Sequence, residues 1–225
     1  MQVMRLIRGS VGRKLLVAVT GLLLVGFVIA HLLGNLTIYY GEEGINAYAV
    51  HLRSLGPLLW LFRAGLLAVF AVHVWLGIWL TLENRAAKPT AYAKRQPRRT
   101  TFAGRTMIWS GLALAAFIVY HLLHFTFRFT HPEISHFVDP AGRADVLRMV
   151  VLSFRQLTVT IIYLVGMAAL WLHLKHGIGS TFQTLGANDD RSLPVLSGVG
   201  LATALILALG FSAIPVLIYI GIVTI

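Results

Sequence analysis

The sequence predicts an all-α integral membrane protein, a bundle of five transmembrane helices that form a single domain over residues 1–225. Composition is the first reason: of 225 residues, 57% are hydrophobic and only 12% are charged, whereas soluble domains average about 25% charged residues. The mean hydropathy is +0.78. The second reason is a set of five long apolar stretches, and the third is the placement of basic residues between them. Such a chain has too little polar surface for water, so we expect the lipid bilayer to be its main solvent.

A helix needs roughly 20 apolar residues to cross the hydrocarbon core of a bilayer. Five stretches meet that length, at residues 15–39, 58–82, 107–127, 157–174 and 193–225. Each is rich in Leu, Val, Ala and Ile and contains Gly, as membrane helices often do. The first is too long for the apolar part of a cleavable signal peptide, so we expect it to be retained. Pro215 is expected to break the last stretch late.

Positive charge predicts how the chain is inserted. The segments 1–14, 85–105 and 175–191 carry most of the 19 Lys and Arg residues, and a five-span chain places all three on the same side. Basic loops remain in the cytoplasm. We therefore expect a protein of the bacterial cytoplasmic membrane with its N-terminus inside and its C-terminus outside. The net charge of +11 is then explained without nucleic acid, and the loop 85–105 is either a docking surface or a loop against anionic lipid.

The chain has no cysteine. This excludes a cysteine-ligated iron–sulfur cluster, a thiol nucleophile, a disulfide and covalent c-type haem attachment within the chain. Any redox cofactor must therefore be held by other side chains.

Histidines are the most informative residues. Ionisable groups inside a bilayer are costly and tend to mark function, and six of the nine histidines lie in or at the end of a span: His31, His73, His121, His124, His173 and His176. Four successive spans each supply at least one. Four-helix bundles hold cofactors between facing helices, and neutral imidazole is a ligand of haem iron. The pattern therefore predicts haem binding.

Depth in the membrane predicts how the histidines pair. At a rise of about 1.5 Å per residue, His31 lies roughly 25 Å from the inner end of its span and His121 roughly 24 Å from the inner end of its own. His73 lies roughly 18 Å from the inside, and His173 is near the inner end of the fourth span. We therefore predict two bis-histidine haems, an outer one between His31 and His121 and an inner one between His73 and His173.

Further residues are secondary candidates for contact with haem or quinone. His124 and His176 each lie three positions beyond a predicted ligand. Gly77 and Gly177 each follow a predicted ligand at i+4, where a small residue lets a flat macrocycle approach the backbone. Arg63 and Arg155 lie in apolar surroundings and could pair with haem propionates.

Short motifs run through nearly the whole chain: residues 10–14 (SVGRK), 31–36 (HLLGNL), 46–49 (NAYA), 55 (L), 120–125 (YHLLHF), 173–177 (HLKHG) and 182–186 (FQTLG). In these motifs, in its loop lengths and in its five spans, the chain resembles the cytochrome b-558 subunit family of succinate dehydrogenases and fumarate reductases. The resemblance implies a five-helix anchor that binds two b haems and works with menaquinone. It places the haem ligands on His31, His73, His121 and His173, and it leaves the roles of His124 and His176 open.

The resemblance also implies a division of labour among subunits. A flavoprotein subunit oxidises succinate, an iron–sulfur subunit relays the electrons, and this chain passes them through the inner and then the outer haem to quinone. No catalytic residue for succinate chemistry is then expected here. The carboxylate that lies near quinone in the family is not placed, although Glu42 and Glu43 are close to the right region.

Three alternatives remain. A dihaem cytochrome b of a hydrogenase or formate dehydrogenase is disfavoured by the motif at 46–49 and by the single histidine in each of the first two spans. A proton-coupled transporter would need acidic partners in the membrane, yet Glu83 is the only acid near a span. A purely structural anchor is disfavoured by the matched depths of the histidines.

Overall fold

The computed structural model describes residues 9–87, 102–187, 189 and 191–225, so the part of the basic loop from 88 to 101 lies outside the described residues. Five helices are long and apolar enough to cross a membrane, as predicted. The main helices of these spans are α2 (Ser10–Asn35), α4 (Pro57–Ala86), α6 (Met107–His121), α8 (Leu157–Thr184) and α9 (Ser192–Tyr219). Between them lie η1 (Leu36–Tyr40), α3 (Gly41–Ser54), α5 (Phe102–Arg105), η2 (Leu122–Thr126), η3 (Pro132–Ile134) and α7 (Val146–Phe154). The first span continues without a break to Ser54, and the third reaches its full length of 20 residues only with the turn that follows α6, at Thr126. The described residues form no strand, only one isolated bridge between Val138 and Ala144.

The ends of the helices differ from the ends of the apolar stretches. The fourth helix continues past residue 174 to Thr184, because the polar residues after 174 interrupt the hydrophobicity but not the helical backbone. It stops at Gly186, which adopts a φ of 72° and closes a Schellman turn through Ala187 N–H to the Phe182 carbonyl at 3.0 Å. The last helix ends in the same way at Gly221 (φ 80°), and Pro215 lies inside it without ending it.

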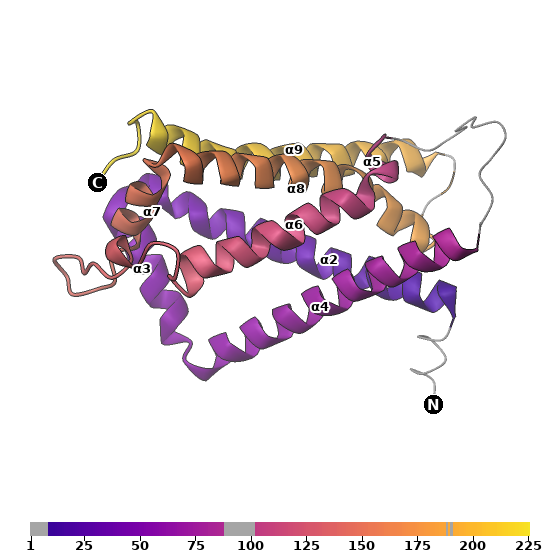
Figure 1. Ribbon diagram of the computed structural model, residues 1–225, viewed down its shortest axis with the longest axis horizontal. Helices are drawn as coiled ribbons and strands as arrows, with labels where there is room; N and C mark the ends of the chain where they lie inside the picture. Colours follow the sequence, from indigo (N-terminus) through magenta and orange to yellow (C-terminus); the bar gives the residue numbers. More distant parts are fainter. Residues whose placement is uncertain (1–8, 88–101, 188, 190) are drawn as a thin grey trace.

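The long helices lie roughly along one direction, with the beginning of α2 and the C-terminus at opposite ends of the bundle (Figure 1). Helices α8 and α9 make the most extensive contact, and α6 packs against α8. The end of the bundle that carries α3 and α7 is called the outer end below, and the opposite end the inner end, after the orientation expected from the sequence. Two apolar clusters form the core around α8 and α9, one near Tyr163 at the outer end and one near Leu170 in the middle. By contrast, α4 packs mainly against α2 and buries only Leu76. The core is therefore built on α8, and α4 stands at the edge of the bundle.

A cap that the sequence analysis did not predict closes the outer end. It consists of α3 and α7, which pack together (Figure 1). Asn46 of α3 is fully buried, and its side-chain oxygen accepts the backbone N–H groups of Val146 at 2.8 Å and Leu147 at 3.0 Å. These groups belong to the first turn of α7, which has no helical partner for them. Asn46 therefore caps a helix that begins 100 residues later in the chain.

An ionic cluster ties the same cap together. The Arg143 guanidinium donates to Asp139 at 2.6 Å and to Glu43 at 2.8 Å and 3.0 Å. Asn46 also donates to Asp139 at 3.2 Å. Burial alone would raise the pKa of Asp139, but the hydrogen bonds from Arg143 and Asn46 lower it below its ordinary value. Glu43, which lies near the expected quinone region, is engaged in this ion pair.

At the inner end, Arg13 and Glu83 tie α2 to α4. Arg13 is buried, and its guanidinium donates to the Glu83 carboxylate, the longer contact being 2.7 Å. It also lies over the ring of Trp79 at 5.4 Å. Glu83 therefore serves as the partner of a buried cation. This structural role accounts for the one acid near a span without the proton transport that the transporter alternative would assign to it.

We predict that Asn46→Ala destabilises the protein by about 2 kcal/mol, because two backbone N–H groups of α7 and the Asp139 carboxylate each lose a partner. The measurement is the unfolding temperature of the purified chain in detergent. Ala47→Ser, at an exposed position of the same helix, is the control. Equal unfolding temperatures for Asn46→Ala and the wild type would contradict the capping role.

The lowered pKa of Asp139 predicts a specific acid sensitivity. A carboxyl group whose pKa is lower in the folded state stabilises that state above its unfolded pKa of about 3.9, and this contribution is lost as the pH falls through the folded value. The unfolding temperature of the wild type should therefore drop more steeply below about pH 4 than that of Asp139→Asn. Glu133→Gln, at an exposed carboxyl of the same end, should retain the wild-type slope.

Candidate cofactor site

Two pairs of histidine rings face each other between the helices. His31 of α2 and His121 of α6 lie with ring centroids 5.8 Å apart and planes at 79°. His73 of α4 and His173 of α8 lie 6.3 Å apart with planes at 73°. The structure thus brings together the residues that the depth argument paired, and each pair joins two different helices.

The spacing of the rings fits two ligands on opposite sides of one iron. A metal–imidazole bond is about 2 Å long, and the ring centre lies roughly 1 Å beyond the nitrogen, so two such ligands place their centroids about 6 Å apart. Among the described residues, no group of three or more His, Cys, Asp or Glu side chains could hold a metal ion. Pairs rather than larger groups suit haem, because the macrocycle supplies the remaining four ligands.

Hydrogen bonds at the inner pair determine which ring nitrogens are available. His73 Nδ1 lies 3.1 Å from Thr20 Oγ1, and the Thr20 hydroxyl donates its only proton to the Leu16 carbonyl at 2.7 Å. The Val17 carbonyl, at 3.1 Å, is a second acceptor for this proton. A Thr20 hydroxyl that donates to either carbonyl can only accept from the ring, and this arrangement favours the tautomer of His73 with its proton on Nδ1 and its lone pair on Nε2. A metal-bound histidine has the same arrangement, with the far nitrogen fixed by a hydrogen bond.

The partner ring repeats this arrangement. His173 Nδ1 lies 3.4 Å from Ser110 Oγ, and Ser110 donates to the Met107 carbonyl at 3.1 Å. His173 is therefore also protonated at Nδ1, with its Nε2 lone pair available. Each ring rests on a glycine of the neighbouring helix, since a Cβ on Gly21 would lie 3.2 Å from His73 and one on Gly111 would lie 3.1 Å from His173.

At the outer pair, a longer chain of hydrogen bonds has the same effect. His124 Nε2 lies 3.1 Å from Ser153 Oγ, and Ser153 donates to the Met149 carbonyl at 2.7 Å. The proton of His124 is therefore on Nε2, and its Nδ1 accepts from the Tyr163 hydroxyl at 3.0 Å. Tyr163 then accepts from His121 Nδ1 at 3.3 Å. His121 thus also keeps its lone pair on Nε2.

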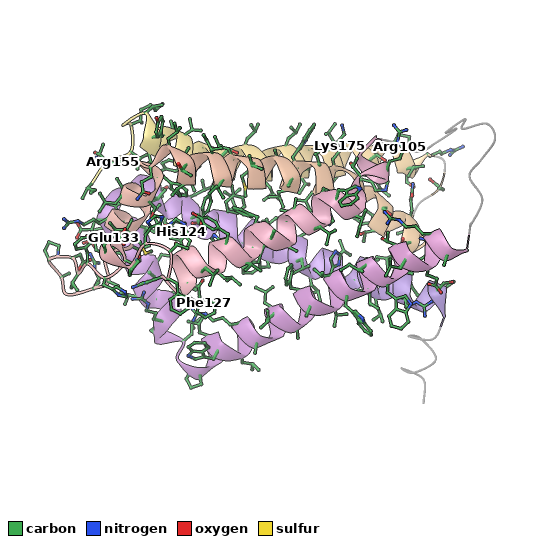
Figure 2. The ribbon with its side chains drawn as sticks, viewed as in Figure 1. Arg105, His124, Phe127, Glu133, Arg155 and Lys175 are labelled. Carbon is green, nitrogen blue, oxygen red and sulfur yellow. The ribbon has the colours of Figure 1, made fainter. Side chains whose placement is uncertain are left out.

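This chain of hydrogen bonds indicates a structural role for His124. Both of its ring nitrogens are engaged and its side chain is buried, so it supports His121 through Tyr163. A π-helical turn, η2, surrounds it, with Phe127 N–H bonded to the Leu122 carbonyl at 2.8 Å. Such turns are rare and often occur at functional sites. Figure 2 shows His124 at the same end of the bundle as Glu133 and Arg155.

The fourth ring, His31, is held mainly by packing. It stacks on Phe27 of the preceding turn at 5.4 Å and lies 5.8 Å from the ring of Phe211 in α9. The Asn35 amide nitrogen lies 3.4 Å from each ring nitrogen. The contacts of His31 therefore position the ring but do not select one of its tautomers.

Within the described part of the chain, the other residues that the sequence suggested for contact with haem or quinone form no hydrogen bond or aromatic contact with the facing rings. The His176 ring lies against Gly104 of α5. Gly77 borders open space, whereas a Cβ on Gly177 would lie 3.2 Å from the Met107 methyl group. Arg63 is exposed and lies over the ring of Trp60 at 5.0 Å. Arg155 is exposed at the outer end of the bundle (Figure 2).

Sequence reasoning missed the residues that orient the rings: Thr20, Ser110, Ser153 and Tyr163. A faint signal exists for the first two, because each directly precedes the glycine on which the histidine ring rests. No family model, curated protein or solved structure matches the chain. The two facing pairs, with three of the four rings oriented through Nδ1, are the main structural argument for function.

If a haem is held between His31 and His121, we predict that Tyr163→Phe raises its midpoint potential by a few tens of millivolts, equivalent to roughly 1 kcal/mol. Without its acceptor, His121 is a less basic ligand and stabilises the oxidised iron less. The measurement is a redox titration followed by visible absorbance. Tyr120→Phe is the control, since the Tyr120 hydroxyl makes no hydrogen bond within the described part of the chain. An equal shift in both variants would refute the orienting chain.

Proposed function

We propose that this chain is the membrane-anchor cytochrome b subunit of a succinate:quinone oxidoreductase, which carries electrons through two b haems to quinone. The carrying observation is the presence of two histidine pairs between facing helices, at two depths and with a spacing that suits bis-histidine ligation. The motif resemblance supplies the identity of the complex. In this proposal His31 and His121 hold the outer haem, and His73 and His173 hold the inner one.

The chain's residues bind and orient, while the bound haems supply one-electron chemistry. Thr20, Ser110 and Tyr163 accept hydrogen bonds from Nδ1 of the three rings that they contact. The lone pair on Nε2 of each ring would then be available to the iron. With two histidine ligands, each haem would have no free coordination position for oxygen, which would suit electron transfer. The succinate chemistry belongs to the flavoprotein subunit, so this chain is a non-catalytic subunit of the enzyme.

The inner end is the proposed docking side for the iron–sulfur and flavoprotein subunits. Arg105 and Lys175 lie at that end (Figure 2), and positive charge favours the cytoplasmic side of a bacterial membrane. The inner histidine pair is the nearer one to this end, so electrons would enter there. The quinone, in this proposal menaquinone, is reduced or oxidised within the membrane.

We predict two low-spin b haems per chain, measured by pyridine-haem quantitation and electron paramagnetic resonance. His73→Ala and His173→Ala should each remove the same haem, and His31→Ala and His121→Ala the other. His176→Ala is the matched control that should retain both haems, because this residue is not a proposed ligand and takes no part in the hydrogen-bond chain that holds His121. A sample without haem absorbance would favour a transporter, and co-purification with hydrogenase or formate dehydrogenase subunits would favour the other cytochrome b class.

A further inference from the structure

The corner where α3 ends and α4 begins lies at the outer end of the bundle (Figure 1). A hollow of about 640 Å³ opens there. Its lining consists of Arg53, Gly56, Pro57, Leu59, Trp60 and Arg63. This volume is in the range of sites that take small molecules or headgroups. The lining combines two guanidinium groups with an indole ring, and neither haem binding nor the docking of subunits explains it.

The positive charges at this corner are not balanced by acids. Arg53 and Arg63 are exposed, and neither forms an ion pair with a described carboxylate, whereas Arg143 at the same end has two. A third arginine, Arg128, is near: burial, and then the charge of Arg53, lower its pKa. Like charges that gather in a poorly hydrated place destabilise one another unless an anion joins them.

The backbone holds Arg128 in this neighbourhood. It is the only non-glycine residue in the described ranges with a positive φ, 59°, and its guanidinium donates to the Ser135 carbonyl at 2.7 Å. A left-handed backbone is uncommon for a long side chain. Arg128 is thus fixed at the end of the third span beside a corner that is already positive.

The surface next to the hollow is apolar. Trp60, Leu61 and Phe62 of α4 are 68%, 68% and 61% exposed, and they follow directly from the hollow along the first turns of the helix. Tryptophan favours the boundary between headgroups and acyl chains. Arg63 lies about one turn further along α4 than Trp60, and its guanidinium reaches back over the Trp60 ring at 5.0 Å. The corner therefore presents cations among exposed apolar side chains, which matches an anionic phospholipid and not a soluble anion.

We propose that the α3–α4 corner binds an anionic phospholipid of the outer leaflet, with Arg53 and Arg63 on its phosphate and the exposed face of α4 against its acyl chains. Arginine suits this ligand because its planar fork donates two parallel hydrogen bonds to a phosphate. A net negative headgroup is preferred to a zwitterionic one, since a choline cation would meet the same arginines. This site does not depend on the proposed electron-transfer function.

Native mass spectrometry of the purified full chain in neutral detergent tests the proposal. Titration with phosphatidylglycerol or phosphatidylcholine gives the dissociation constant of the first bound lipid. The wild type should bind phosphatidylglycerol more tightly, and Arg53→Gln or Arg63→Gln should each weaken that binding about five-fold, the contribution of one basic residue at a membrane surface. Arg63→Lys should restore part of the loss, because it keeps the charge without the fork.

Arg155→Gln is the matched control, an exposed arginine at the same end that does not line the hollow. It should leave the affinity unchanged. Haem content and helical circular dichroism report whether each variant is folded. Equal affinity of the wild type for the two lipids, or equal weakening by Arg155→Gln, would overturn the proposal. Displacement of phosphatidylglycerol by millimolar inorganic phosphate would also overturn it, since the site would then take soluble phosphate.

Discussion

A histidine ring inside a bilayer must give its one N–H to an acceptor, and the identity of that acceptor decides which ring nitrogen keeps its lone pair. Lipid offers no alternative partner, so the neighbouring helices must provide one. In this protein they provide Thr20, Ser110 and Tyr163, each with its own proton already committed elsewhere. For these three histidines the acceptor lies on a helix other than that of the ring, so each hydrogen bond also ties two helices together, whereas His31 is positioned mainly by packing.

The inner and outer pairs satisfy the N–H groups of their rings with different side chains. At the inner pair, short hydroxyl side chains take the N–H and pass the hydrogen bond to a carbonyl of their own helix. At the outer pair, the chain runs through Tyr163 and His124 to Ser153 of α7. The ring of His121 is therefore connected by hydrogen bonds to α7, which belongs to the cap. The cap helps to orient this ring as well as to close the end of the bundle.

The five spans could be predicted from the sequence because an apolar stretch of about 20 residues is long enough to cross a bilayer as a helix. The sequence could also predict which histidines meet, since helical rise converts position into depth. It could not predict the acceptors: a single Thr or Ser in a span usually bonds its own backbone, and nothing local shows that Thr20 also faces a ring on α4. The cap was missed for a similar reason, because Asn46 acts on backbone groups 100 residues away.

Because α4 packs weakly, a group bound between His73 and His173 would also help to hold this helix in the bundle. This helix buries only Leu76, and its side-chain ties to the bundle include the Arg13–Glu83 ion pair, the hydrogen bond between His73 and Thr20 and the facing of His73 with His173. The first two join α4 to α2 alone. A group ligated by both His73 and His173 would join α4 directly to α8, the helix that carries the core. Cofactor binding and helix assembly are then the same event at the inner site, as in other proteins where ligation supplies folding free energy. At the outer site they would be separable, because the two helices that carry His31 and His121, α2 and α6, both already pack against α8.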